Sequence, residues 1–155
     1  MSFDPILPQT GLGGWRFLTR TLDRQLELAA RAPDTARDLA AFETRAGGIG
    51  SVEALMADRA VLRVVLGAFG LEGDLDKRAF VRKVIEEGTL DREAFANRLA
   101  DPAYRRMSET LGFGDLGGRL GLSDVREEIA ELFPLRRFEA AVGARDVDLR
   151  LAMNF

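Results

Sequence analysis

The spacing of apolar residues predicts helices along almost the whole chain. Apolar side chains recur at steps of three and four, the period of one helix face, and the first such series is Trp15, Leu18, Leu22, Leu26 and Ala29. Helix caps and breakers divide this pattern into predicted helices over 14–32, 34–46, 59–69 and 102–111, with others beginning near Ser51, Asp76, Asp91 and Asp124. Pro33 ends the first helix or starts the second.

The segment from Arg59 to Phe69 is the most apolar of these helices. Only Arg59, Arg63 and Gly67 form a polar or small strip along it, at steps of four. A helix that is apolar almost all round lies at the centre of a domain, and Gly67 would let another backbone approach it closely. Because an unpaired buried charge is costly, Arg63 is a candidate buried ion pair with an Asp or Glu of a neighbouring helix. The alternative is an Arg63 that faces solvent on a narrow exposed strip.

Residues typical of helix ends refine the boundaries. Ser51 and Asp58 are good N-caps for two successive helices, and Gly70 suits the position that ends the second of them. Asp101 followed by Pro102 predicts another helix start.

Two segments begin alike. Asp76 and Asp91 each occupy the expected cap position, and Phe80 and Phe95 follow four residues later. This similarity is too short and too local to indicate a solenoid repeat, so it predicts two similar helix starts.

The C-terminal part combines a predicted helix with a stripe that fits two kinds of structure. Asp124 with Glu127 predicts a capping box, Pro134 is expected to kink or restart the helix that follows, and Gly143 to end it. A stripe that alternates like a strand comes last: Val147, Leu149, Leu151 and Met153. The same residues also fit helical spacing, and a lone strand would leave its backbone unpaired, so a short helix is preferred.

These patterns predict an all-α fold without a significant sheet. We expect a single compact domain of about seven to nine helices around a central apolar helix over about 59–69. Residues 1–13 contain Pro5, Pro8 and Gly11 without periodicity, which indicates a flexible N-terminal arm before a helical domain over 14–155.

Composition excludes several kinds of chemistry. The 155-residue chain has no Cys and no His, so disulfides, thiolate nucleophiles, His-dependent triads and the usual zinc sites are excluded. A formal net charge of −3 argues against nucleic acid as a partner. No apolar run approaches the roughly 18 residues of a membrane span, and no signal peptide is recognisable. A cytoplasmic protein is expected, and export by a route without a cleaved signal stays open.

No motif identifies a catalytic, cofactor or metal site. The run from Gly112 to Gly117 fits G-x-G-x-x-G, but it lacks the preceding strand that a nucleotide site needs, so a flexible interhelical loop is expected. The acidic run over 72–76 departs from the order of a calcium loop and predicts a helix cap at Asp74 or Asp76. We therefore expect no cofactor and no metal.

The chain resembles a family of uncharacterised helical bacterial proteins of unknown function. The resemblance spans about 14–154 and rests on these segments: Gly14-Trp-Arg-Phe-Leu18, Asp23-Arg-Gln25, Leu66-Gly-Ala-Phe-Gly-Leu71, Glu87-Gly-Thr89, Phe95-Ala-Asn-Arg-Leu99, Phe138-Glu-Ala-Ala-Val-Gly143 and Asp148-Leu-Arg-Leu-Ala152. Members are often encoded among flagellar genes, so the resemblance implies a role associated with motility.

The function expected from these observations is that of a non-enzymatic interaction or structural and assembly protein. The resemblance implies that it is associated with the flagellum. A protein partner is expected, homo-oligomerisation is left open, and the candidate partner surface comprises Trp15, Val147, Leu149, Leu151 and Met153. The alternative is a small-ligand-binding domain or an enzyme that uses only Arg and carboxylates.

Overall fold

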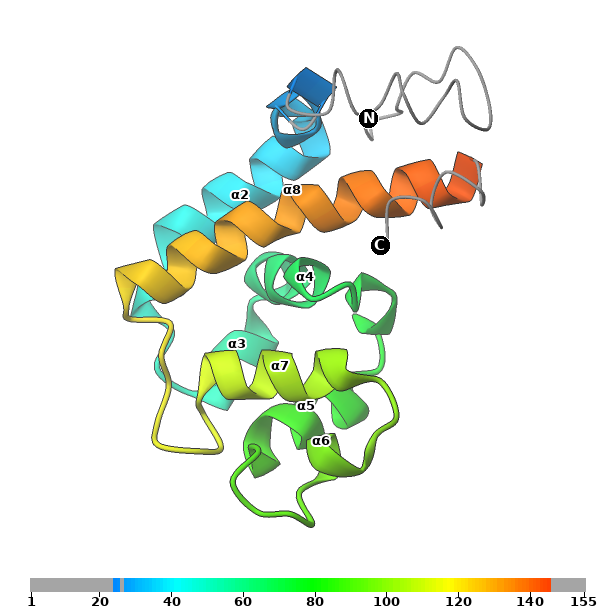
Figure 1. Ribbon diagram of the computed structural model, residues 1–155. Coiled ribbons are helices and arrows are strands. Elements are labelled where there is room, and N and C mark those ends of the chain that lie inside the picture. The colour runs from blue at the N-terminus through cyan, green and yellow to red at the C-terminus, as the bar shows by residue number, and fades with distance from the viewer. Residues whose placement is uncertain (1–23, 26, 146–155) are drawn as a thin grey trace. The chain divides into compact units, whose positions relative to one another are not determined.

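A computed structural model describes residues 24–25 and 27–145 of the chain. The chain divides into two compact units, one formed by residues 38–133 and the other by residues 1–37 with 134–155. The described residues of each unit form helices and their connections, and no strand occurs among them (Figure 1). The all-α prediction is therefore confirmed. The arm over 1–13 and the stripe over 147–153 lie outside the described residues, so the predicted division into an arm and a domain over 14–155 stays a prediction.

The described residues form a succession of mostly short helices. The α-helices are α2 (Pro33–Arg45), α3 (Val52–Ala57), α4 (Arg59–Ala68), α5 (Arg78–Glu87), α6 (Phe95–Arg98), α7 (Pro102–Leu111) and α8 (Ser123–Arg145). Two 3-10 helices, η1 (Ala46–Gly48) and η2 (Glu72–Asp74), lie between them. Residues 27–31 are also helical, and Pro33 begins the next helix, as the sequence predicts. The boundaries between the two units fall inside α2 and α8.

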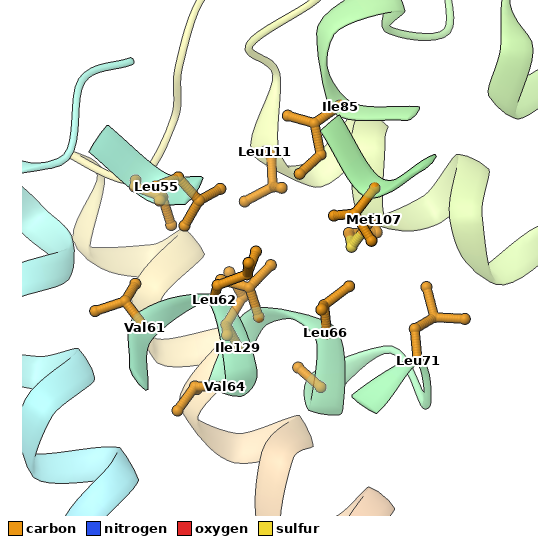
Figure 2. Close-up of a cluster of buried hydrophobic side chains, with 14 of the residues drawn as sticks. Leu55, Val61, Leu62, Val64, Leu66, Leu71, Ile85, Met107, Leu111 and Ile129 are labelled. Carbon is orange, nitrogen blue, oxygen red and sulfur yellow. The ribbon is translucent and has the colours of Figure 1, made fainter. Parts of the chain in front are cut away.

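Helix α4 is the central helix of the larger unit, as its composition predicts. Its side chains from Val61 to Ala68 are buried, except that Arg63 is partly exposed. Figure 2 shows the apolar cluster around it, in which α4 meets side chains from α3, α5, α7 and the first half of α8. The labelled members are Leu55, Val61, Leu62, Val64, Leu66, Leu71, Ile85, Met107, Leu111 and Ile129. Burial of this apolar surface supplies the main driving force for folding of the unit.

Asp58 caps α4 as predicted and also joins it to α2. Its Oδ1 atom accepts a hydrogen bond from the Val61 backbone N–H at 3.2 Å. The Arg45 guanidinium donates to both Asp58 oxygens, at 2.7 and 3.0 Å. These hydrogen bonds hold the pKa of Asp58 below its usual range, because they stabilise the charged carboxylate.

The other predicted caps of this region are also present. Ser51 Oγ accepts from the Ala54 N–H at 3.1 Å, and the Asp101 carboxylate accepts from the Ala103 N–H at 2.9 Å. At the end of α4, Gly70 takes a φ of 75°, which is a left-handed conformation that glycine adopts readily. The caps therefore fix the ends of α3, α4 and α7 locally.

The predicted caps at Asp76 and Asp91 are wrong. Lys77 is the N-cap of α5 and provides no side-chain cap, while Asp76 forms an ion pair with Arg59 at 2.7 Å. Helix α6 is confined to Phe95–Arg98, and the Asp91 carboxylate accepts from the Glu93 N–H at 2.9 Å in the preceding turn. Asp side chains stabilise such local turns in competition with a helix, and here the turn prevails.

The predicted cap at Asp124 and the predicted helix end at Gly143 are also wrong. Helix α8 begins at Ser123, so Asp124 lies inside its first turn instead of capping it. It runs through Pro134 and past Gly143 to Arg145, without a restart. Pro134 removes one backbone donor, at a cost of about 3 kcal/mol in a helix interior, and a glycine there costs about 1 kcal/mol. Neither residue ends α8, which continues to Arg145.

In the smaller unit, Arg137 of α8 donates a hydrogen bond to Thr35 Oγ1 of α2 at 3.0 Å and lies 3.7 Å from the Asp34 carboxylate. Thr35 is buried, so this contact satisfies a buried hydroxyl. The buried apolar residues of this unit in the described ranges are Ala29, Ala32, Phe138 and Val142.

Another group packs closely against Gly67, as its position on α4 predicts. This group is an aromatic ring and not the backbone expected from the sequence. A Cβ placed at Gly67 would stand 2.6 Å from ring atoms of Phe133, which is fully buried. The missing side chain of Gly67 thus leaves the space that the Phe133 ring occupies.

We expect Gly67→Val to lower the free energy of unfolding by about 2 kcal/mol, because the added side chain overpacks the Phe133 ring. Urea denaturation measures the change. Gly48→Val is the matched control, since nothing lies within 4 Å of a Cβ there. Equal stability of the two variants would contradict this account of the α4–Phe133 contact.

Tyr104 donates its phenolic hydrogen to Asp74 Oδ2 at 2.5 Å, and Lys77 Nζ lies 3.2 Å from the same carboxylate. Asp74 thus acts as a buried acceptor and not as the predicted helix cap. The hydrogen bond to Asp74, followed by burial, raises the pKa of Tyr104 to about 12, from an ordinary value of 10.0.

Because the folded pKa of Tyr104 lies above the unfolded value, this hydrogen bond stabilises the fold below pH 10 and is lost as the pH rises toward 12. Tyr104 is the chain's single tyrosine, so the tyrosinate absorbance reports it alone. We expect the native chain to titrate near 12 and the urea-unfolded chain near 10. Native titration near the unfolded value would show that the hydrogen bond does not form in solution.

Candidate functional site

Two loops of the larger unit are joined by one carboxylate. Residues 88–94 connect α5 to α6, and residues 112–122 connect α7 to α8. Asp115 in the second loop accepts hydrogen bonds from the first: from the Thr89 N–H at 2.6 Å, the Thr89 hydroxyl at 2.9 Å and the Leu90 N–H at 3.2 Å. Hydrogen bonds to a charged acceptor are the stronger kind, so this junction fixes the two loops against each other.

Two glycines let the loop backbones touch at this junction. Gly88 ends α5 with a φ of 69°, and Gly114 packs directly against its backbone. A Cβ at Gly114 would stand 2.5 Å from the Glu86 carbonyl oxygen, so no larger residue fits. Glycine in this G-x-G-x-x-G run thus serves loop packing, and the run follows helix α7 and not a strand.

Further hydrogen bonds hold the outer parts of both loops. Asn97 Nδ2 donates to the carbonyl oxygens of Thr89 and Asp91, each at 2.8 Å. In the second loop, the Arg119 N–H donates to the Leu111 carbonyl at 2.8 Å. The loop predicted to be flexible is therefore internally bonded along much of its length.

These bonded loops expose two leucines. The relative exposure of Leu90 is 68% and that of Leu116 is 96%, the highest among the large apolar residues that the structure describes. Fully burying a leucine stabilises by roughly 1.5–3 kcal/mol, a gain that neither side chain realises in the folded chain. These two exposed leucines on hydrogen-bonded loops make this surface the candidate site.

Two adjoining hollows lie beside these leucines. The first has a volume of about 450 Å³ and is lined by Thr89, Leu90, Glu109, Gly112, Asp115, Leu116, Gly117, Gly118 and Arg119. The second has a volume of about 640 Å³ and is lined by Thr89, Leu90, Arg92, Asn97, Arg105, Arg106 and Glu109. The hollows share Thr89, Leu90 and Glu109, so they form one continuous surface.

The arginines of this surface differ from most others of the same unit. Elsewhere in residues 38–133, six of the seven arginines bind carboxylates or backbone carbonyls of the chain itself: Arg45, Arg59, Arg63, Arg78, Arg82 and Arg126. The seventh, Arg98, is exposed and lies over the Phe95 ring. Within the described ranges, Arg92, Arg105, Arg106 and Arg119 are exposed and have no such partner. We call Leu90, Leu116, Glu109 and these four arginines the leucine–arginine surface.

The candidate site residues of the sequence analysis are only partly visible. Trp15, Val147, Leu149, Leu151 and Met153 lie outside the described residues, so their role as a partner surface stays a prediction.

Arg63 donates to Asp38 Oδ1 at 2.8 Å within the larger unit. The Asp38 side chain is 9% exposed and that of Arg63 is 30% exposed. The acidic member of this ion pair is thus buried, and the arginine reaches it from a partly exposed position.

Sequence reasoning missed the leucine–arginine surface. Leu90 and Leu116 each stand in a loop among glycine, threonine and aspartate, where no helical period gives an apolar residue a buried face. That isolation was the available signal. No signal separated the unpartnered arginines from the others, because pairing depends on which carboxylates the fold brings near each of them.

The described residues show neither a metal cluster nor a membrane span. No group of three or more Asp or Glu side chains that could hold a metal ion occurs in the described ranges. Likewise, none of the helices in this part of the chain is both long and apolar enough to cross a membrane.

Comparison with known proteins places the chain in a family. Residues 68–155 match the family described as Protein of unknown function (DUF1217). The chain belongs to this family. The resemblance to a family of unknown function is thereby confirmed, and the matched part of this DUF1217 protein includes the whole leucine–arginine surface.

A solved structure shares the fold. The chain is similar to the crystal structure of protein AGR_C_984 from Agrobacterium tumefaciens, with 28% sequence identity and a TM-score of 0.84. The similarity covers 97% of this chain and 69% of that chain. A search of curated proteins finds no match. These relatives support the helical fold. Neither of them indicates an activity.

We expect Asp115→Asn to loosen the loop junction of the DUF1217 protein. The amide has one acceptor oxygen and no charge, so it cannot replace the hydrogen bonds to Thr89 and Leu90. Amide hydrogen exchange at Thr89 and Leu90 should become at least about tenfold faster, and the free energy of unfolding should fall by about 1–3 kcal/mol.

The control for this experiment is Glu128→Gln, which removes an exposed carboxylate that has no hydrogen bond or ion pair in the described ranges. Unchanged exchange at Thr89 and Leu90 in Asp115→Asn would show that Asp115 does not order these loops.

Proposed function

We propose that this DUF1217 protein is a non-enzymatic interaction protein that binds a protein partner through the leucine–arginine surface. The observation that carries the proposal is the exposure of Leu90 and Leu116 on loops that Asp115 holds together. A loop that folds only to connect two helices has no need of large apolar side chains at its tip. A binding loop needs them, because buried apolar anchors dominate the affinity of protein interfaces.

Order in these loops favours binding over mere tolerance of exposed apolar residues. A mobile loop would lose conformational entropy when it binds, and that loss would weaken the complex. Here the hydrogen bonds of Thr89, Asn97 and Asp115 already fix the backbone in the free chain. The two leucines are thus presented in advance of any partner.

We extend the proposal to assembly at the flagellum, in the cytoplasm. Its support is the resemblance to a family whose members are often encoded among flagellar genes. An assembly factor needs a surface for protein partners and no catalytic group, and the leucine–arginine surface meets that need.

The proposal is tested with a tagged full-length chain that replaces the native copy in the bacterium encoding it. We expect Leu90→Ser with Leu116→Ser to reduce co-purification of the specific partner at least about tenfold, because two apolar anchors are lost. Swimming in soft agar should decline in parallel. Thermal unfolding should be nearly unchanged, since both side chains are exposed in the folded chain.

Leu122→Ser is the matched control, because Leu122 is a 48% exposed leucine of the same region that lines neither hollow. It should retain both partner and motility. Normal capture by the double variant would overturn the binding role of this surface. Lost capture with normal motility would overturn the flagellar assignment alone.

A further inference from the structure

We propose that the partner presents an acidic amphipathic segment to the leucine–arginine surface. Its carboxylates would lie opposite the arginines, and its apolar side chains against Leu90 and Leu116. This inference rests on the proposed function and adds to it the chemistry of the partner.

The charge of the leucine–arginine surface is opposite in sign to that of the whole chain. The chain has a net charge of −3, yet Arg92, Arg105, Arg106 and Arg119 gather on this one surface. Asp115 also lines it, but the hydrogen bonds of Thr89 and Leu90 already occupy its carboxylate. The surface therefore has an excess of positive charge on a chain whose net charge is negative, which favours an acidic partner.

The arginines of the leucine–arginine surface have no carboxylate partner within the described part of the chain. In residues 38–133, Arg45, Arg59 and Arg82 are also partly exposed, yet each binds a carboxylate of the chain. The arginines of the surface bind none in the described ranges. Their guanidinium groups therefore keep the planar, forked donors that bind carboxylates best.

The two hollows of the surface place apolar and charged side chains next to each other. Leu116 and Arg119 border the first hollow alone. Arg92, Arg105 and Arg106 border the second alone, and Leu90 borders both. The two hollows share a boundary, so one segment can place apolar groups in the first and carboxylates in the second. An amphipathic helix that lies in a groove presents such alternating anchors.

Glu109 argues against a polyanion as the occupant. Its side chain is exposed, lines both hollows and has no ion pair in the described ranges. A nucleic-acid backbone or an anionic lipid surface would bring a second negative charge against it. A protein segment can instead offer Glu109 a hydrogen-bond donor while it covers the leucines.

The test uses synthetic peptides of about 20 residues, long enough for a marginally stable helix. One peptide has a face of leucine and a face of glutamate, a second has lysine in place of glutamate, and a third has serine in place of leucine. We expect the full-length chain to bind only the first, as measured by fluorescence anisotropy. Binding should weaken severalfold between low and physiological salt, because the contacts involve exposed charges.

Arg105→Gln with Arg106→Gln should weaken binding of the first peptide at least about tenfold, because two charge pairs are lost. The control is Arg24→Gln with Arg31→Gln, which changes the net charge equally at exposed arginines outside the surface. It should bind as the unmodified chain does. Equal binding of the glutamate and lysine peptides would overturn the proposal, and so would equal weakening by both variants.

Two further probes test the other occupants. Duplex DNA and vesicles of phosphatidylglycerol with phosphatidylcholine are titrated against the same chains. Binding of either that depends on Arg105 and Arg106, without binding of the acidic peptide, would replace the protein segment with that polyanion.

The outcome is separable from that of the proposed function. If none of the peptides binds, while partner capture still depends on Leu90 and Leu116, the acidic chemistry is wrong and the docking surface stands. If capture does not depend on these leucines either, both proposals are wrong.

Discussion

Helix α4 has almost no polar face, and the arrangement of the larger unit follows from the need to cover it. A buried helix satisfies its own backbone hydrogen bonds, but each of its sides must meet apolar groups of other elements. Short helices meet this need from several directions, and Gly67 admits the Phe133 ring on the remaining side. The caps at Asp58 and Gly70 then let the chain turn sharply at both ends of α4.

This way of covering α4 determines what the connecting loops can do. The core is filled mainly by helix side chains, and the loops after α5 and α7 add only a few buried apolar residues, among them Ala94 and Leu120. They obtain their order from hydrogen bonds, and above all from those of the Asp115 carboxylate to Thr89 and Leu90. Because these hydrogen bonds and the burial of Leu120 order the loops without Leu90 or Leu116, Leu116 can remain exposed at low cost to stability.

The sequence predicted the features that depend on neighbouring residues and missed those that depend on distant ones. The central helix and the caps at Ser51, Asp58 and Asp101 follow from local spacing and were correct. Asp91 was expected to cap a helix, but its carboxylate stabilises a turn. Asp115 looked like part of a flexible loop, because its partners lie about 26 positions earlier in the chain. No periodicity encodes such a contact.

Two Arg–Glu pairs with the same helical spacing behave differently in this chain. Arg82 and Glu86 lie four residues apart on α5 and form an ion pair at 2.6 Å. Arg105 and Glu109 lie four residues apart on α7, in the same order, and form none. Local helix geometry permits the pair in both places. A partner's carboxylate at Arg105 therefore has to displace only water, and it gains a charge pair without breaking one within the chain.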